Sequence, residues 1–141
     1  MKFHHTDGGR SAAGFKGEAG DCFVRAVSIA TGMQYAEAYK ALNKIAAGEK
    51  RRSKSGRGSS AREGVFSSTA KTFMESIGWK WTPTMKVGSG CKVHMRSDEL
   101  PDGRIIVRLS RHYAAVVDGV LYDNHDCSRD GTRCVYGYWH Q

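Results

Sequence analysis

Two short segments far apart in the chain contain residues that could carry out nucleophilic chemistry. Cys22 follows Asp21 at the start of an apolar, helix-like repeat, and His112 precedes a run of β-forming residues that ends at Asp123. A cysteine thiolate is a strong nucleophile, and a histidine within hydrogen-bonding reach can take the proton of the thiol. These residue types in this order indicate covalent catalysis in which Cys22 attacks a carbonyl carbon.

The spacing of apolar residues predicts a helix that begins at Cys22 and ends at Gly32. We expect Asp21 to cap the first turn with its side chain and Gly32 to terminate the helix in a left-handed conformation. At the first helical position, the positive end of the peptide dipoles favours a thiolate over a thiol. The alternative is that Cys22 is a small apolar residue packed under the helix. The presence of His112 favours the catalytic interpretation.

The segment 104–124 reads as three strands joined by tight turns. Residues 105–109 and 113–117 are rich in β-formers, and Asp118-Gly119 is typical of a type I′ hairpin. A two-residue loop would pair Val117 with Val120. The same pairing continues three residues further along each strand and ends with Ala114 opposite Asp123.

This register predicts that His112 and Asp123 project from the same face of the sheet. They would be diagonal neighbours about 7 to 8 Å apart, a gap that two side chains can close to a hydrogen bond. Asp123 would then orient the imidazole and leave its other nitrogen for Cys22. His125 lies opposite His112 in this register and is the alternative orienting residue. Asn124 would project from the other face and is a weaker candidate.

The Asp-Cys helix start, the later His entering a strand and the Asp after a tight turn resemble the papain-like cysteine peptidase superfamily. The bacteriocin-processing double-glycine peptidases are the most similar small members. The similarity covers the helix 21–32 and the hairpins 100–123, about a quarter of the chain. It implies Cys22 as nucleophile, His112 as base and then acid, and Asp123 as the orienting residue.

The same resemblance implies an oxyanion hole made by the Cys22 amide and a side-chain donor. In the family this donor is commonly a Gln six residues before the cysteine, and here that position is Lys16. Loss of one oxyanion donor typically lowers the rate by about 10²- to 10³-fold. Lys16 is the candidate for this role, because its ammonium group could donate a hydrogen bond to the oxyanion. An amide from the loop 14–20 and a silent enzyme are the alternatives.

The remaining pattern predicts an α+β fold in one domain spanning residues 1–141. Two further helices are expected over 33–45 and from Ser67 or Ser68 to Ile77, and strands over 79–82 and 133–139. Helices come first and an antiparallel sheet follows, which agrees with a papain-like architecture. His4 and His5 are assigned to an exposed terminus.

A basic Gly/Ser-rich loop is predicted at about residues 48–63. The sequence has a net charge of +8, and this loop carries six basic residues and no acidic one between positions 50 and 62. Such a loop suggests nonspecific contacts with nucleic acid or an acidic protein partner, or a solvated insertion. The alternative function is thus a basic binding protein on the same fold. The contact candidates are Lys50, Arg51, Arg52, Lys54, Arg57 and Arg62.

The four cysteines show no close-pair pattern of a zinc ribbon or redox site. We expect all four to be free thiols in a reducing cytosol. A rival zinc set gathers His125, Cys127, Cys134 and His140, although its spacing matches no zinc finger.

The chain lacks an apolar stretch of signal-peptide or membrane-spanning length. This predicts a cytoplasmic protein without a transmembrane segment. We also expect no cofactor or metal, and a peptide or protein substrate. A compact basic chain of this kind would suit a phage or mobile-element accessory protein.

Overall fold

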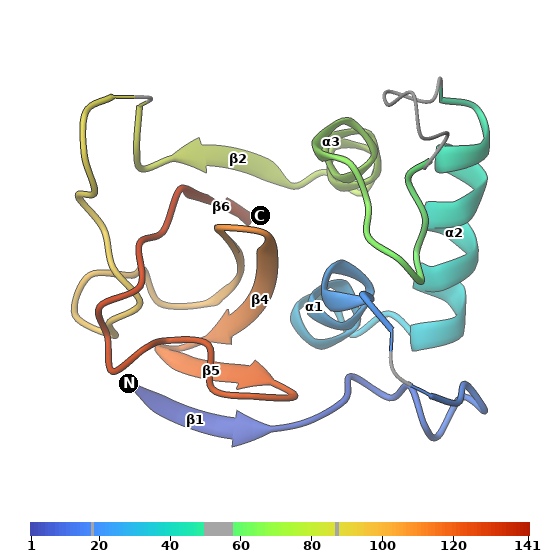
Figure 1. Ribbon diagram of the computed structural model, residues 1–141, viewed down its shortest axis with the longest axis horizontal. Coiled ribbons are helices and arrows are strands. Elements are labelled where there is room, and N and C mark those ends of the chain that lie inside the picture. The colour runs from blue at the N-terminus through green and yellow to red at the C-terminus, as the bar shows by residue number, and fades with distance from the viewer. Residues whose placement is uncertain (18, 50–57, 87) are drawn as a thin grey trace.

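In the part of the chain that the structure describes, three helices pack on one face of a six-stranded mixed sheet (Figure 1). The structure is a computed structural model that describes residues 1–17, 19–49, 58–86 and 88–141. The strand order is β1-β5-β4-β3-β6-β2. The strands are β1 (Lys2–His5), β2 (Lys80–Pro83), β3 (Arg104–Leu109), β4 (His112–Val117), β5 (Val120–Asp123) and β6 (Gly137–His140). The predicted α+β class is confirmed.

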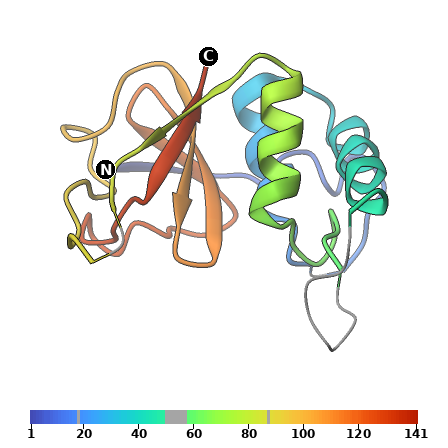
Figure 2. The same ribbon diagram turned by 90° about the horizontal axis from the view of Figure 1, so that it is seen from above.

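The helices form a layer beside the sheet in which α1 lies closest to the strands (Figure 2). Helix α1 (Cys22–Thr31) contacts β4, β3 and β5. Helix α2 (Tyr35–Ala47) packs on α1 and on α3 (Ser67–Ser76). Helix α1 therefore meets the sheet directly, and α2 packs against α1 and α3 on the side away from the sheet (Figure 1).

The two ends of α1 behave differently from each other. Gly32 adopts the left-handed conformation with φ of 79° and donates its amide to the Ser28 carbonyl, as the sequence predicts. Asp21 occupies the N-cap position, but its side chain makes no capping hydrogen bond within the described residues. Its carboxylate turns instead to Arg25 and Tyr35. The prediction of a side-chain cap was wrong because a buried cation competes more strongly for this carboxylate.

The predicted β4–β5 hairpin is confirmed with its register. Val117 pairs with Val120, Val116 with Leu121 and Ala115 with Tyr122. Asp118 and Gly119 both have positive φ, 49° and 78°, as a type I′ turn requires.

The prediction of an antiparallel sheet was wrong at the N-terminus. Strand β1 pairs in parallel with β5, with Phe3 beside Leu121 and His5 beside Asp123. The terminus is exposed, as expected, yet it is an ordered edge strand. It continues the sheet because β5 would otherwise leave its outer backbone groups unpaired.

Two apolar cores lie on opposite faces of the sheet. The core on the helix side contains Phe23, Val27, Met74 and Ile106 among others. The core on the other face contains alternate residues of β3, β4 and β5 together with Met95, Leu100, Cys127 and Val135 from the loops. Because both faces are covered, β3 and β4 read as nearly continuous apolar runs.

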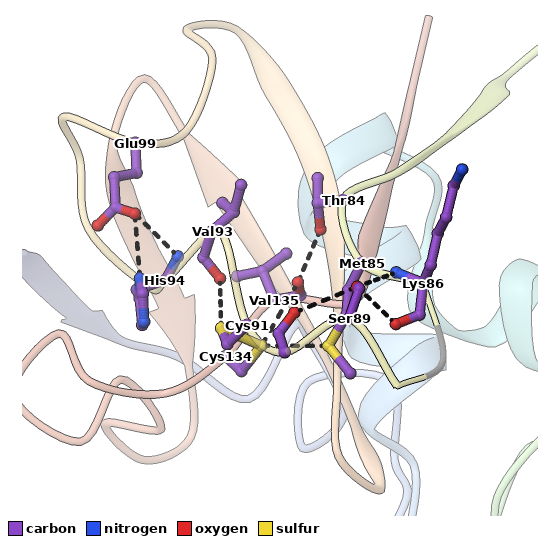
Figure 3. The surroundings of a disulfide bond; sticks show 11 residues. Thr84, Met85, Lys86, Ser89, Cys91, Val93, His94, Glu99, Cys134 and Val135 are labelled. Atoms are coloured by element: carbon purple, nitrogen blue, oxygen red, sulfur yellow. Dashed lines mark hydrogen bonds and ion pairs between the residues drawn. A yellow bond between two sulfur atoms is a disulfide. The ribbon is translucent and has the colours of Figure 1, made fainter.

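A disulfide joins Cys91 to Cys134 across the loops on the second face (Figure 3). The Cα atoms are 5.8 Å apart, within the ordinary range for a disulfide. Beside it, the Thr84 hydroxyl donates to the Val135 carbonyl at 2.7 Å (Figure 3). The prediction of four free thiols was therefore wrong for this pair. Cys22 and Cys127 are free.

The predicted basic loop is structured in its described part. Ser60 and Gly64 exchange two backbone hydrogen bonds, and the buried Ala61 donates its amide to Asn43 on α2 at 2.9 Å. Residues 50–57 lie outside the described residues. Among the described helices, none has the length and apolar character needed to cross a bilayer.

Candidate active site

The side chains of His112 and Asp123 meet where β4 begins and β5 ends. The Nε2 atom of His112 lies 2.6 Å from Oδ2 of Asp123. Both residues lie in adjacent antiparallel strands, and the hairpin register makes them diagonal neighbours, so short side chains can span the gap. Because Asp123 binds Nε2, Nδ1 is the ring nitrogen left for another partner.

Cys22 and His112 line the same pocket. This pocket has a volume of about 440 Å³ and lies between the start of α1, the loop 63–65 and the β3–β4 turn. Its walls also include Arg25, Tyr113 and His125. The Cys22 side chain is half-buried, so the sulfur is sheltered yet accessible from the pocket. The structure thus brings the predicted nucleophile and base to one cavity.

The electrostatic environment favours the charged forms of His112 and Asp123. Burial opposes the imidazolium, but the hydrogen bond to Asp123 and interactions with the thiols of Cys127 and Cys22 raise the pKa of His112 to about 11. Burial likewise opposes the carboxylate of Asp123. The hydrogen bond and charge of His112, the Asn124 amide and the charge of Arg25 nevertheless lower the pKa of Asp123 below its ordinary value.

Arg25 links the helix that carries Cys22 to the strand that carries Asp123. From one turn into α1, its guanidinium binds the Asp21 carboxylate and lies 3.2 Å from Oδ1 of Asp123. All three side chains are buried. Asp123 is therefore held at one oxygen by Arg25 and at the other by His112. Sequence analysis missed Arg25, although its i,i+4 spacing from Asp21 is a recognisable ion-pair signal.

A second buried arginine fixes the loop that precedes Cys22. Arg10 donates to the Tyr35 hydroxyl at 2.8 Å and to the Lys16 carbonyl at 3.0 Å. Tyr35 in turn donates to Asp21. Burial and this hydrogen bond raise the pKa of Tyr35, which keeps it a donor. The chain of contacts from Arg10 to Asp21 anchors the residue immediately before the predicted nucleophile.

Lys16 lies in a neighbouring hollow with Arg10, Asp21 and Asn124. Within the described residues, Lys16 is not part of the wall of the Cys22 pocket. The first backbone amides of α1, by contrast, are left open because Asp21 does not cap them in this part of the chain. Cys22, the first residue of α1, lines the pocket, whereas Lys16 does not.

His125 lies beside His112 and completes a set of metal-ligand types. The two ring centroids are 5.2 Å apart. One ligand atom each from His112, Asp123 and His125 lies within 4.8 Å of the others, so these residues could hold an ion of the zinc type. The rival zinc set is wrong because Cys134 is in a disulfide and offers no thiolate.

Most of the predicted anion-contact residues lie outside the described residues. Lys50, Arg51, Arg52, Lys54 and Arg57 belong to this group. Arg62 is exposed and lies 3.5 Å from Glu63, an acidic neighbour that offsets its charge. Of the six predicted contact residues, Arg62 is the one that the structure describes.

Comparison of the chain with known protein families, with curated proteins and with solved structures found no match. The geometry and chemistry of the site are therefore the basis for inferring a function.

Proposed function

We propose that the protein is a thiol hydrolase with a papain-like arrangement that cleaves an amide, isopeptide or thioester bond. The supporting observation is the position of His112, which is bound to Asp123 at 2.6 Å and opens with Cys22 into one pocket. A nucleophile, a base and a group that orients the base are the three parts of covalent acyl transfer.

In the proposed reaction, the proton of Cys22 already resides on Nδ1 of His112, and the resulting thiolate attacks the substrate carbonyl carbon. The developing oxyanion is met by the first amides of α1. His112 returns the proton to the leaving group as the carbon–nitrogen or carbon–sulfur bond breaks, which leaves a thioester on Cys22. Water then attacks the thioester, with His112 again taking and returning a proton. Asp123 holds the ring orientation and favours the imidazolium throughout.

The test is hydrolysis of a fluorogenic peptide library by the wild type and by Cys22→Ala. We expect Cys22→Ala to lose all hydrolysis and Asp123→Ala to lower it while remaining folded. Cys127→Ala is the matched control, since Cys127 is the other free thiol and also interacts with His112. Full activity in Cys22→Ala would contradict the proposal.

A further inference from the structure

A second, apolar pocket adjoins the Cys22 pocket. Its volume is about 220 Å³. Typical small-molecule pockets enclose roughly 300 to 1,000 Å³, so this one suits a single side chain. It is lined by Ser67, Lys71, Trp81, Arg108, Tyr113 and Trp139. We call it the side pocket.

The side pocket and the candidate active site are neighbours that share part of a wall. Arg108 and Tyr113 line both cavities. A chain bound at Cys22 can therefore extend past Arg108 into the side pocket.

The walls of the side pocket are aromatic. Trp81 and Trp139 pair across β2 and β6 with ring centroids 5.3 Å apart. Trp139 is buried, whereas Trp81 is 37% exposed and is one of two large apolar side chains so exposed among the described residues. When an apolar group covers the exposed tryptophan, apolar surface is removed from water, and this stabilises the complex.

Arg108 lies in the wall shared by the two cavities, where its guanidinium contacts hydroxyl groups and an aromatic ring. It donates to the Ser67 hydroxyl and, at 3.3 Å, to the Tyr113 hydroxyl, and its guanidinium lies 5.6 Å from the Tyr113 ring centroid. Within the described residues, no carboxylate lies in ion-pairing distance of Arg108. Lys71 adds a second cation at the rim, paired at 3.6 Å with the exposed Glu75. An orientated guanidinium in this position complements a carboxylate.

We propose that the side pocket selects peptide substrates that carry a large apolar side chain next to an acidic residue near the scissile bond. The apolar group would pack against Trp81 and Trp139, and the carboxylate would bind Arg108. This specificity deepens the proposed hydrolase function and rests on it for the reaction, although the binding step can be tested alone.

The test is an NMR titration of the full-length Cys22→Ala variant, which binds without turnover. The probes are acetyl-Phe-Asp-amide and acetyl-Asp-Phe-amide, which cover both chain directions. At least one should shift the indole signals of Trp81 and Trp139. Replacing Phe by Ala in the probe should weaken binding about 10- to 100-fold. Replacing Asp by Asn should weaken it about two- to fivefold, as for a half-exposed ion pair.

Matched variants assign these losses to the side pocket. Trp81→Ala should remove the preference for Phe over Ala, while Phe3→Ala, at the other exposed apolar residue, should keep it. Arg108→Gln should remove the preference for Asp over Asn, while Arg104→Gln on the same strand should keep it. Circular dichroism checks that each variant is folded.

AMP offers a ring that stacks on tryptophan and a phosphate that binds arginine, so it represents a nucleotide as the competing kind of ligand. Three results would overturn the inference: unshifted indole signals, equal binding of the Phe and Ala probes, or tighter binding of AMP than of either acidic peptide. Because Cys22→Ala is used, these results are independent of catalysis. If the side pocket binds these peptides but the wild type cleaves none of them, the proposed hydrolase function is contradicted and the binding specificity is not.

Discussion

At the scale of single residues, the account depends on the charge state of His112. The imidazole is bound to a carboxylate on one side and opens toward a thiol on the other. Interactions with both groups raise its pKa despite burial. A protonated imidazole beside a thiol stabilises the thiolate, which is the reactive form.

The first prediction concerns the titration of His112. In NMR, its midpoint should lie well above the ordinary value near 6.5. Asp123→Asn should lower this midpoint, because the Asp123 hydrogen bond is the largest single favourable cause, and Cys22→Ala should also lower it. Asp126→Asn is the control, since Asp126 binds Ser128 instead. A wild-type midpoint near 6.5 would contradict the account.

The second prediction follows from linkage between protonation and folding. Because the folded-state pKa of His112 is raised above the unfolded value of 6.5, its stabilisation is fully present below about pH 6.5. It is lost as the pH rises toward about 11. The difference in unfolding free energy between wild type and His112→Gln should therefore shrink from pH 6 to pH 10, roughly the window between these pKa values. Urea unfolding at both pH values measures it, and a growing difference would oppose the assignment.

The three candidate catalytic residues could be predicted from the sequence, but the residues that hold them in place could not. Cys22, His112 and Asp123 were found because residue type and hairpin register are local signals. Lys16 was chosen by resemblance alone, and the structure places it in the adjacent hollow. Arg25 was missed because its contact with Asp123 spans 98 positions along the chain.

At the scale of elements, α1 positions the site. It presents Cys22 at its first residue, and one turn later it reaches β5 through Arg25. Breaking a buried ion pair by removing one partner leaves an uncompensated charge. Arg25 forms two buried ion pairs, one with Asp21 and one with Asp123.

The third prediction is that Arg25→Met destabilises the fold by about 2 kcal/mol or more, because Asp21 and Asp123 would each lose a buried cation and keep one other, Arg10 and His112 respectively. Urea unfolding at neutral pH measures the change. Arg104→Met is the matched control. Arg104 is exposed and makes one hydrogen bond to the Ile29 carbonyl, so its loss should change stability by less than about 0.5 kcal/mol. Equal effects of the two substitutions would refute the role of Arg25.

Elements with local turn signals were predictable, and pairings over long distances were not. Asp118-Gly119 determines the β4–β5 register by itself. Strand β1 has only four residues, all exposed, and its partner is more than a hundred positions away. Parallel pairing of this kind has no hairpin signal.

At the scale of the whole molecule, the Cys91–Cys134 disulfide ties the loops of the second face together. It closes a segment with a sequence separation of 43. Disulfides persist in oxidising environments and are rare in a reducing cytosol. The bond therefore argues against the reducing surroundings in which we expected four free thiols.

The fourth prediction is that reduction of this disulfide lowers the free energy of unfolding by about 2 to 4 kcal/mol, because the unfolded chain gains conformational freedom. Urea unfolding with and without dithiothreitol measures the effect. The Cys91→Ser/Cys134→Ser variant should be indifferent to the reductant. Equal stability of the wild type under both conditions would contradict the prediction.

Cys22 and His112 are proposed to form one reactive unit. Alkylation of Cys22 by iodoacetamide, followed by peptide mapping in the full-length protein, tests it most directly. The account predicts that Cys22 reacts rapidly at about pH 6, where an unassisted thiol is slow, and that His112→Ala slows this reaction about tenfold or more. The buried Cys127 serves as the internal reference. Slow alkylation of Cys22 at about pH 6, unchanged in His112→Ala, would contradict the account.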